Sequence, residues 1–328
     1  MGLTGSMTTM RAMVIAATGG PEVLTPARMP LPLRINSEVL VRVAAAGINP
    51  IDAKTRSGAG VSSAIPGFPA ILGNDFSGVV VEAPYEAHQF QPGDEVFGML
   101  AVPRMAGCYA EYVTVPSLGI ARKPRRLTHA EASGVPTAAL TAWGMVVDVA
   151  KAHEGQRMLI HAGAGGVGHF AVQFAAYFGA HVIATGSGPN LSWLRELGAT
   201  EVIDYRSTRF DEAVGDLDVV IDMIGNVHDD TGTRSLGVLR PGGLLINVPT
   251  GSWPTVIEDA AAAGVRATGY KVAPDGSTLA VIGRLLDSGD IRVSIDAVFD
   301  LEEAAQAHSA IESGHTRGKI VLQVAEFG

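Results

Sequence analysis

The chain has 328 residues, of which 47% are hydrophobic and 17% are charged, and its formal net charge is −9. This composition is typical of a folded protein and excludes a disordered one, and the length favours two domains. The negative charge argues against a protein that binds nucleic acid through phosphate contacts, because such proteins carry basic surfaces.

The cysteine count and the apolar runs exclude further classes. The single cysteine, Cys108, excludes an intrachain disulfide and a cysteine-rich zinc site. The sequence holds no apolar run of about 18 residues, the length that a membrane span requires. The opening MGLTGSMTTM lacks the cationic patch and apolar core of a secretory signal. We therefore expect a cytoplasmic protein without a membrane partner, whose native start is Met7 or Met10.

The first part of the chain, residues 10–125, is predicted to be rich in β-strands. The valines of EVLVRV (38–43) alternate and share one face of a strand. Further strands are expected at 76–82, 92–98 and 109–116. Short strands separated by glycine and proline turns predict a small barrel or sandwich.

From about residue 128 the pattern changes to alternating helices and strands. A helical segment capped by Thr128 precedes a buried strand at 157–163. Strands alternating with helices of this length predict a parallel sheet wound on both sides. A helix at 277–289 and a returning strand at 318–324 are expected after residue 268. The alternating elements are helix 167–180, strand 181–187, helix 190–199, and strands 201–205, 218–225 and 243–249.

A glycine-rich loop, Gly163-x-Gly165-x-x-Gly168, joins strand 157–163 to the next helix. Gly163 permits a tight turn, Gly165 lets a pyrophosphate approach the backbone, and Gly168 lets the helix pack closely on the sheet. The helix N-terminus adds free N–H groups and a partial positive charge. The loop therefore predicts a dinucleotide site formed by Gly163, Ala164, Gly165, Gly166, Val167 and Gly168.

The tip of the following strand indicates which dinucleotide binds. NAD-binding proteins place Asp or Glu there, about 20 residues after the loop, to hold the ribose 2′-OH. This strand ends instead with Thr185, Gly186 and Ser187. A carboxylate ~4 Å from a 2′-phosphate would cost about 4 kcal/mol per charge pair at an effective dielectric of about 20. Its absence favours NADP(H), although no cation lies nearby along the chain before Arg195.

Motifs that lie in order along nearly the whole chain carry a resemblance to a known family. They are GGPEVL (19–24), GINPIDAKTRSG (47–58), PAILGNDFSGVVVE (69–82), GDEVFG (93–98), YAEYVTVP (109–116), AALTAW (138–143), AGAGGVG (162–168), LRELGATEVIDYR (194–206), LRPGGLLINV (239–248) and SGHTRGKIVL (313–322). With these motifs the chain resembles the zinc-independent quinone oxidoreductases of the medium-chain dehydrogenase/reductase superfamily.

The resemblance implies an α/β architecture. A doubly wound parallel Rossmann domain, residues 126–268, would be inserted into a β-rich GroES-like catalytic domain formed by residues 10–125 and 269–328. Substrate and nicotinamide would meet in a cleft at the carboxyl ends of the parallel strands. A homodimer is also implied, with GLLINV (243–248) as the edge strand.

The resemblance also implies that no metal takes part. Zinc-dependent members carry Cys where AGIN (46–49) stands, and His-Glu where Asn74 and Asp75 stand. Asn is a poor zinc ligand, and a catalytic zinc needs three ligands from Cys, His or carboxylate. The nine histidines are scattered without ligand spacing. The expected reaction is hydride transfer from NADPH, which supplies the chemistry, to a small-molecule quinone or α,β-unsaturated carbonyl.

Several residues are expected in the catalytic site. By resemblance, Asn49 lies near the nicotinamide and bonds a substrate oxygen or the cofactor ribose; the alternative is a turn residue before Pro50. Tyr109 and Tyr270 are candidate walls of the substrate pocket, with core packing as the alternative for Tyr109. No proton donor is assigned, so solvent would supply the proton.

The resemblance places further cofactor contacts outside the glycine loop. Ser187 and Tyr205 would lie near the 2′-phosphate, where many relatives carry Lys at the position of Asn190. The remaining contacts are Thr137, Gly225 and Val248.

Four basic or titratable side chains have structural alternatives. Arg317 and Lys319 either add charge to the site or are ordinary surface charges, and His161 and His169 are expected to pack rather than to catalyse. Two other functions stay open: an enoyl-thioester reductase on the same scaffold, and an NADPH-binding sensor or structural protein without turnover.

Overall fold

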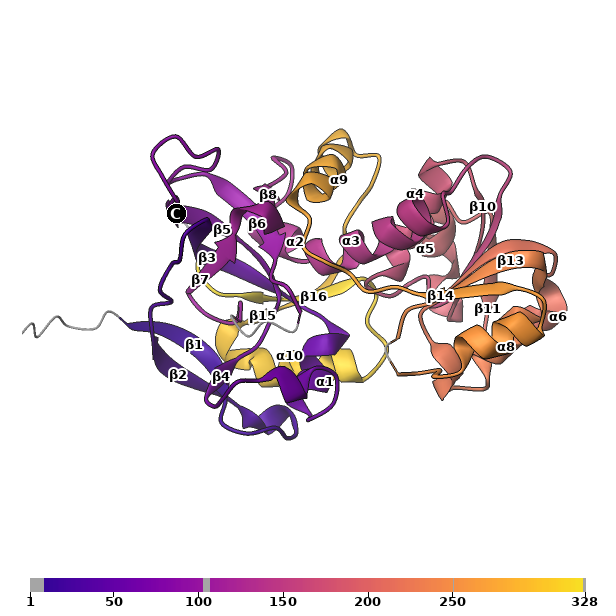
Figure 1. Cartoon of the computed structure of the whole chain (residues 1–328), viewed down its shortest axis with the longest axis horizontal. Coiled ribbons are helices and arrows are strands. Elements are labelled where there is room, and N and C mark those ends of the chain that lie inside the picture. Colours follow the sequence, from indigo (N-terminus) through magenta and orange to yellow (C-terminus); the bar gives the residue numbers. More distant parts are fainter. Residues whose placement is uncertain (1–8, 103–106, 250, 327–328) are drawn as a thin grey trace, which may run out of the picture. The chain divides into compact units, whose positions relative to one another are not determined.

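The computed structural model describes residues 9–102, 107–249 and 251–326 (Figure 1). The expected start at Met7 lies outside these residues. The chain divides into two compact units: unit 1 is Met1–Thr137, Ala273–Gly289 and Ile295–Gly328, and unit 2 is Ala138–Val272 and Asp290–Ser294. Within the described ranges, none of the helices combines the length and apolar character needed to cross a bilayer.

Unit 1 is organised around the long strand β3 (Glu38–Ile48). This strand pairs antiparallel with β5 (Asp75–Glu82), β7 (Tyr112–Pro116) and β16 (Lys319–Gln323). Only Arg42 of β3 is exposed, because the strand has neighbours along both edges and is covered on both faces. The seven-stranded sheet is completed by β6 (Glu95–Met99), β8 (Ile120–Arg122) and β15 (Ile295–Asp300).

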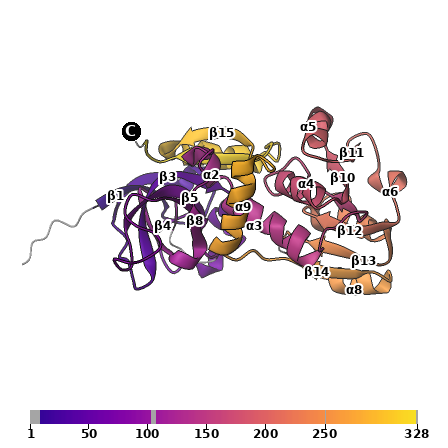
Figure 2. The same ribbon diagram turned by 90° about the horizontal axis from the view of Figure 1, so that it is seen from above.

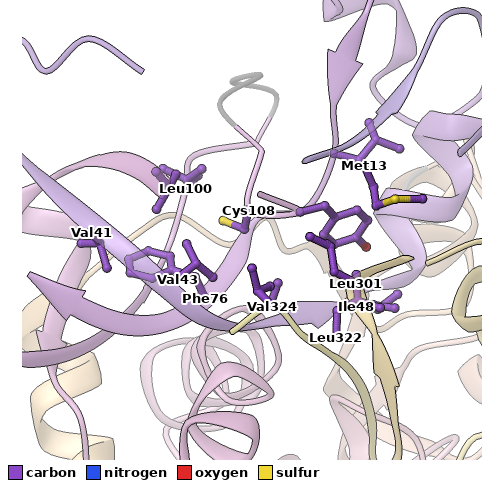
Figure 3. Packing of buried hydrophobic residues seen from close by; sticks show 14 of the residues in the cluster. Met13, Val41, Val43, Ile48, Phe76, Leu100, Cys108, Leu301, Leu322 and Val324 are labelled. Carbon is purple, nitrogen blue, oxygen red and sulfur yellow. The ribbon is translucent and has the colours of Figure 1, made fainter. Parts of the chain in front are cut away.

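The C-terminal strands return to the N-terminal ones in the same sheet. In Figure 1, yellow β15 and β16 lie beside indigo β3, and β16 is bonded to β3 and β15. Figure 3 shows the core beneath this sheet, where Ile48, Phe76, Leu301 and Leu322 converge from distant parts of the chain. Helices of unit 1 are α1 (Pro50–Arg56), α2 (His129–Ser133), α9 (Gly276–Ser288) and α10 (Ala304–Glu312), and a second sheet holds β2 (Leu24–Pro30), β1 (Thr9–Ile15) and β4 (Ala70–Ile71).

Unit 2 contains a six-stranded parallel sheet in the order β11-β10-β9-β12-β13-β14. The chain moves outward from β9 in one direction and from β12 in the other. Right-handed crossovers therefore place the two sets of helices on opposite faces, and in Figure 2 α4 and α5 lie away from α8. The strands are β9 (Arg157–Ile160), β10 (His181–Gly186), β11 (Glu201–Asp204), β12 (Leu217–Asp222), β13 (Leu239–Asn247) and β14 (Arg266–Gly269).

The helices of unit 2 pack on the strands that precede or follow them. Helix α4 (Gly168–Tyr177) contacts β9 and β10, and α5 (Leu191–Glu196) contacts β10 and β11. On the other half, α7 (Thr231–Leu236) contacts β12 and β13, and α8 (Val256–Ala262) contacts β14. The doubly wound parallel sheet and the β-rich partner domain predicted from the sequence are confirmed.

Three local expectations differ from the structure. The sequence GLLINV is not an edge strand, because β13 pairs with β12 on one side and β14 on the other. The strand expected from residue 109 begins at Tyr112. The segment after the Thr128 cap is interrupted at Pro136, where α3 (Pro136–Trp143) begins and then continues as a π-helical turn, Gly144–Val149. The homodimer itself stays a prediction.

Candidate active site

The carboxyl edge of the parallel sheet gathers the predicted cofactor residues of unit 2. Each follows a different strand, and the carboxyl ends of parallel strands meet at one edge. The strand order changes direction between β9 and β12, so the glycine loop after β9 stands at the topological switch point, where α/β proteins bind ligands. The residues brought to this edge are Gly163–Gly168 after β9, Ser187 and Asn190 after β10, Tyr205 after β11, Gly225 after β12 and Val248 after β13.

The tight turn of the glycine loop falls one residue before its predicted place. Ala162, not Gly163, has the left-handed backbone, with φ of 50°. The N–H of Gly163 donates to the carbonyl of Thr185 at 2.9 Å. A Cβ on Gly163 would stand 3.1 Å from the side chains of Ala184 and Leu194. Gly163 therefore serves the close packing of the loop on β10 and α5, and the turn is made by its neighbour.

Gly165 and Gly168 differ in what surrounds them. A Cβ on Gly165 would have a single neighbour within 4 Å, the carbonyl oxygen of Ala162 at 3.3 Å. A Cβ on Gly168 would overlap that same oxygen and lie 2.8 Å from the Cα of Gly163. Gly168 is thus required by the protein's own packing, whereas the space beside Gly165 is open. This is the arrangement expected of a backbone that a pyrophosphate approaches.

His161 supports the loop from below. Its ring is 1% exposed, with Nδ1 3.3 Å from Thr185 Oγ1 and Nε2 3.0 Å from Ser235 Oγ. Thr185 Oγ1 in turn accepts from the N–H of Ala162 at 3.2 Å. Burial lowers the pKa of His161 to about 4, which keeps the ring neutral near pH 7. His161 therefore packs and orients the turn, as the sequence predicted.

The tip of β10 carries a polar set for the cofactor ribose. Asn190 Nδ2 donates to Ser187 Oγ at 3.1 Å. Across the ladder, Gly186 is paired with Asp204, so the carboxylate that β10 lacks stands on β11. The backbone N–H of Arg206 donates to Asp204 Oδ1 at 3.0 Å, and its guanidinium lies 5.8 Å from the centre of the exposed Tyr205 ring.

Arg206 was not predicted as a phosphate contact, because it is far from Ser187 along the chain and comes near it only through the pairing of the strands. It lies two residues after β11, the strand next to β10, and so reaches the same edge as Ser187. A basic residue just beyond the third strand of a parallel sheet is the sequence feature that could have identified Arg206. The tip thus combines a cation and an aromatic ring, which suit a phosphate, with a carboxylate that suits a ribose hydroxyl.

The other half of the edge is organised by Asp222. This carboxylate is fully buried and accepts from the backbone N–H groups of Ile224 and Gly225, both at 2.9 Å. It also accepts from Asn247 Nδ2 at 3.2 Å, which ties β12 to β13. Gly225 has φ of 73°, a conformation that favours glycine. Asp222 therefore fixes the backbone where Gly225 and Val248 are expected to meet the cofactor.

Asn49 lies in unit 1, in a buried polar network at the end of β3. The residue is 4% exposed and begins helix α1, where its N–H donates to Asp52 Oδ2 at 2.8 Å. Its Nδ2 donates to Asp75 Oδ2 at 2.9 Å, and its Oδ1 accepts from Lys319 Nζ at 2.6 Å. Asn49 is therefore the residue that caps helix α1, with its side chain held in a fixed direction, and its predicted place near the nicotinamide stays a prediction.

Lys319 is not a surface charge. Its side chain is 2% exposed, and Nζ also donates to the carbonyl of Ile48 at 2.5 Å. The register explains the meeting: Ile320 of β16 faces Ile48 of β3, so the residue before it reaches Asn49. Burial lowers the pKa of Lys319, and the neighbouring carboxylates of Asp75 and Asp52 oppose that shift.

Two buried carboxyl groups complete the network. Asp75 Oδ1 accepts from the N–H of Thr137 at 3.0 Å and from its hydroxyl at 2.6 Å. Burial raises the pKa of Asp75 and raises that of Asp52 to about 7. Tyr109 is fully buried, with its hydroxyl 3.3 Å from Asp52 Oδ2 and 3.1 Å from His308 Nε2. Desolvation lowers the pKa of His308 to about 3, so this ring is neutral near pH 7.

The remaining predicted residues take separate places. The hydroxyl of Thr137 donates to Asp75 within unit 1, and its predicted contact with the cofactor stays a prediction. Tyr109 faces the network, and its assignment to the substrate pocket stays a prediction. Tyr270 belongs to unit 2, where its phenol lies against Gly144, a position without room for a larger side chain. His169 is buried, and its Nδ1 lies 3.1 Å from the carbonyl of Gly165.

The segment AGIN (46–49) and the pair Asn74 and Asp75, where zinc-dependent members are expected to carry ligands, hold other donors in this chain. Asn49 and Asp75 do approach each other, but a lysine ammonium stands beside them and the carboxylate is occupied by N–H and O–H donors. Cys108 is buried in the core, which raises the pKa of its thiol. Within the described part of the chain, no cluster of three His, Cys, Asp or Glu side chains could hold a metal ion.

Comparisons with known proteins agree with this architecture. Residues 36–125 match the family described as "Alcohol dehydrogenase GroES-like domain", and residues 197–322 match "Zinc-binding dehydrogenase". The mouse protein "NAD(P)H oxidoreductase RTN4IP1, mitochondrial" is 34% identical over 97% of this chain and 90% of its own length. The Arabidopsis thaliana "NADPH-dependent alkenal/one oxidoreductase, chloroplastic" is 32% identical over 95% of this chain and 79% of its own.

A solved structure has the same fold as this chain. The quinone oxidoreductase from Coxiella burnetii superposes with a TM-score of 0.92 and 38% identity, covering 97% of this chain and all of its own. Together with the glycine loop at the switch point, these similarities assign the chain. It belongs to the medium-chain dehydrogenase/reductase superfamily, among the quinone oxidoreductase-like members.

Proposed function

We propose that the protein is an NADPH-dependent oxidoreductase that transfers a hydride to a quinone or an α,β-unsaturated carbonyl without a metal ion. The observation that carries the proposal is the glycine loop, whose open Gly165 and tightly packed Gly168 stand at the switch point of the parallel sheet. The similarity to an enone reductase and to a quinone oxidoreductase supports the acceptor class.

The residues of unit 2 fit the cofactor in separate roles. Backbone N–H groups of Gly165–Gly168 and the start of α4 would hold the pyrophosphate. Ser187, Asn190, Tyr205 and Arg206 would hold the 2′-phosphate, with the guanidinium of Arg206 supplying the charge that relatives obtain from Lys. Gly225 and Val248 would border the nicotinamide side. When bound, the cofactor supplies the hydride.

Asn49 would act on the acceptor. The acceptor gains a hydride at one carbon, and its carbonyl oxygen gains negative charge until a proton arrives from solvent. A fixed amide N–H stabilises that charge better than mobile water does, because it needs no reorganisation. Asn49 is held for this task by the bond from its Nδ2 to Asp75 Oδ2. Transfer without a metal ion is supported by the donors present, because no three His, Cys, Asp or Glu side chains of the described residues group in a way that could hold one.

The test measures NADPH oxidation with a panel of quinones, enones and enoyl thioesters. Turnover of quinones or enones is expected, and exclusive turnover of enoyl thioesters would favour the enoyl-thioester reductase. Full occupancy by NADPH without any turnover would favour the sensor or structural protein. NADPH binding is measured separately by cofactor fluorescence.

The glycine loop is tested by Gly165→Ala. The added Cβ has only the Ala162 carbonyl near it, so the fold should persist while the pyrophosphate loses its place. Loss of one hydrogen bond to a charged group costs about 1.5–3 kcal/mol, so we expect the Kd for NADPH to rise by about 10- to 150-fold. Gly215→Ala is the matched control, because a Cβ there meets no atom within 4 Å. Equal binding by both variants would contradict the assignment of the loop.

A further inference from the structure

Lys319 is the feature that the proposed function leaves unexplained. A lysine with a 2% exposed side chain is unusual, because burial of an ammonium is costly unless it is paired. Its two hydrogen-bond acceptors are the carbonyl of Ile48 and the side-chain oxygen of Asn49. Both acceptors come from the end of β3, the place where AGIN stands. Lys319 therefore bonds to one short segment, Ile48 and Asn49, and does more than balance the charge of the nearby carboxyl groups.

The partners of the Asn49 side chain decide its orientation. An amide has an oxygen that only accepts and an NH2 group that only donates. Lys319 only donates, and the Asp75 oxygen that faces Asn49, Oδ2, accepts. Rotating the amide by half a turn would place donor against donor and acceptor against acceptor, in a site where water cannot replace the lost bonds. One orientation is thus strongly preferred.

This orientation leaves a defined hydrogen-bonding group. The oxygen is occupied by Lys319, and one of the two Nδ2 hydrogens is directed at Asp75 Oδ2. Among the residues that the structure describes, no acceptor is found for the second Nδ2 hydrogen. An ammonium on the oxygen draws electron density from the amide and makes this N–H a stronger donor. Asn49 is therefore set to donate rather than to accept.

We propose that Lys319 is a positioning residue, which fixes and polarises the amide of Asn49 as a hydrogen-bond donor to the acceptor oxygen that gains charge during reduction. The inference rests on the proposed function of Asn49. It places a basic side chain of the chain itself beside Asn49 and Asp75, in the segments AGIN and GND. Lys319 does not touch the substrate; it acts through Asn49.

The test is a double-mutant cycle of Lys319→Met and Asn49→Ala. Loss of one fixed donor to a developing oxyanion costs about 10²–10³-fold in kcat, so Asn49→Ala should fall in that range. Lys319→Met leaves the donor in place but free to rotate, and we expect a smaller loss of about tenfold. In the Asn49→Ala background Lys319→Met should cost nothing further. The Kd for NADPH should not change in any of these variants.

A matched control comes from the same strand. Gln323 of β16 also donates from its side chain to a backbone carbonyl of β3, that of Ala44 at 3.1 Å, at the far end of the pairing. Gln323→Met should therefore lower stability without lowering kcat. An equal loss of kcat in Gln323→Met and Lys319→Met would show that Lys319 only holds the sheet together, and would overturn the proposal.

A second readout does not depend on turnover. In the protein without cofactor, the side-chain NH2 of 15N-labelled Asn49 should exchange its hydrogens slowly, and Lys319→Met should speed that exchange at least tenfold. Unchanged exchange overturns the proposal. If Lys319→Met does not fold, the double variant Lys319→Met/Asp52→Asn is compared with Asp52→Asn. The double variant removes one of the two buried carboxyl groups together with the lysine, so less buried charge is left unpaired.

The outcomes distinguish a failure of the role proposed for Lys319 from a failure of the role proposed for Asn49. Normal kcat in Asn49→Ala refutes the role of Asn49 and the inference with it. A low kcat in Asn49→Ala with a normal kcat in Lys319→Met refutes the inference alone. Equal losses from Lys319→Met in both backgrounds show that Lys319 acts independently of Asn49 and also refute it. If the wild-type protein reduces no acceptor, the proposed function fails and the exchange measurement still tests the contact.

Discussion

The buried carboxyl group of Asp52 predicts an unusual dependence of stability on pH. Burial raises its pKa from 3.8 to about 7 in the folded protein, while Lys319 and two hydrogen bonds oppose the rise. Between these two values the folded chain binds more protons than the unfolded chain, so stability falls as the pH rises. The difference of roughly three pH units corresponds to about 4 kcal/mol of unfolding free energy.

Asp52→Asn removes this titration and keeps the contacts. Asp52 Oδ2 accepts from the N–H of Asn49 at 2.8 Å and lies 3.3 Å from the Tyr109 hydroxyl, and an asparagine oxygen can take the same place. Urea unfolding of both proteins at pH 5, 6, 7 and 8 gives the difference between them. Between pH 5 and pH 8 the variant should gain about 3 kcal/mol on the wild type, most of it below pH 7, because the remainder arises between pH 3.8 and pH 5. Parallel stability curves would refute the reasoning.

Two further predictions concern the cofactor edge. Arg206→Ala should weaken NADPH binding about fivefold in titration calorimetry, because an exposed ion pair at about 4 Å contributes about 1 kcal/mol. The control is NADH, which lacks the 2′-phosphate, and an equal loss for both cofactors would contradict the role of Arg206. Gly168→Ala should abolish NADPH binding and lower stability by about 1–3 kcal/mol in thermal unfolding, since its Cβ would overlap the Ala162 carbonyl. Gly165→Ala is its control, and equal stability of the two variants would contradict the packing argument.

Unit 2 could be predicted from the sequence because its signals are local. Most strands from β9 to β13 are short apolar runs, and helix α4, with ten residues, is long enough for its period to be read. The short helices α6 (Phe210–Ala213) and α7 were not predicted. Strand β14, with the sequence RATG, has few apolar residues and lies at the edge of the sheet, so its residues carry no strong pattern. Its absence from the prediction led to β13 being placed at the edge.

The glycine loop was predicted at the right place, but not in all its details. Which residue turns the chain depends on backbone angles, and Ala162 adopts a conformation that composition alone would assign to a glycine. Thr185 was predicted at the tip of the strand that follows the loop, beside the expected phosphate site. The structure directs that hydroxyl inward, to His161 and the Ala162 N–H.

The polar network of unit 1 could not be predicted, because its members are far apart in the sequence. Lys319 and Asn49 are 270 residues apart, and a lysine at the start of a strand looks the same whether it is buried or exposed. The only local sign is the buried run after it, Ile320 to Leu322. Lys319 lies beside Asn49 because of the register between β16 and β3, and this register cannot be read from the sequence.

The pairing of β16 with β3 sets the timing of assembly on the ribosome. Lys319 is translated 271 residues after Ile48, which at roughly 5–20 residues per second means a delay of about 14–54 s. During that interval the second half of β3 presents an unpaired backbone edge, and two carboxyl groups await their cation. Newly made chains therefore pass through a stage in which this edge can recruit other strands, and a chaperone that shields it would raise the yield of folded protein.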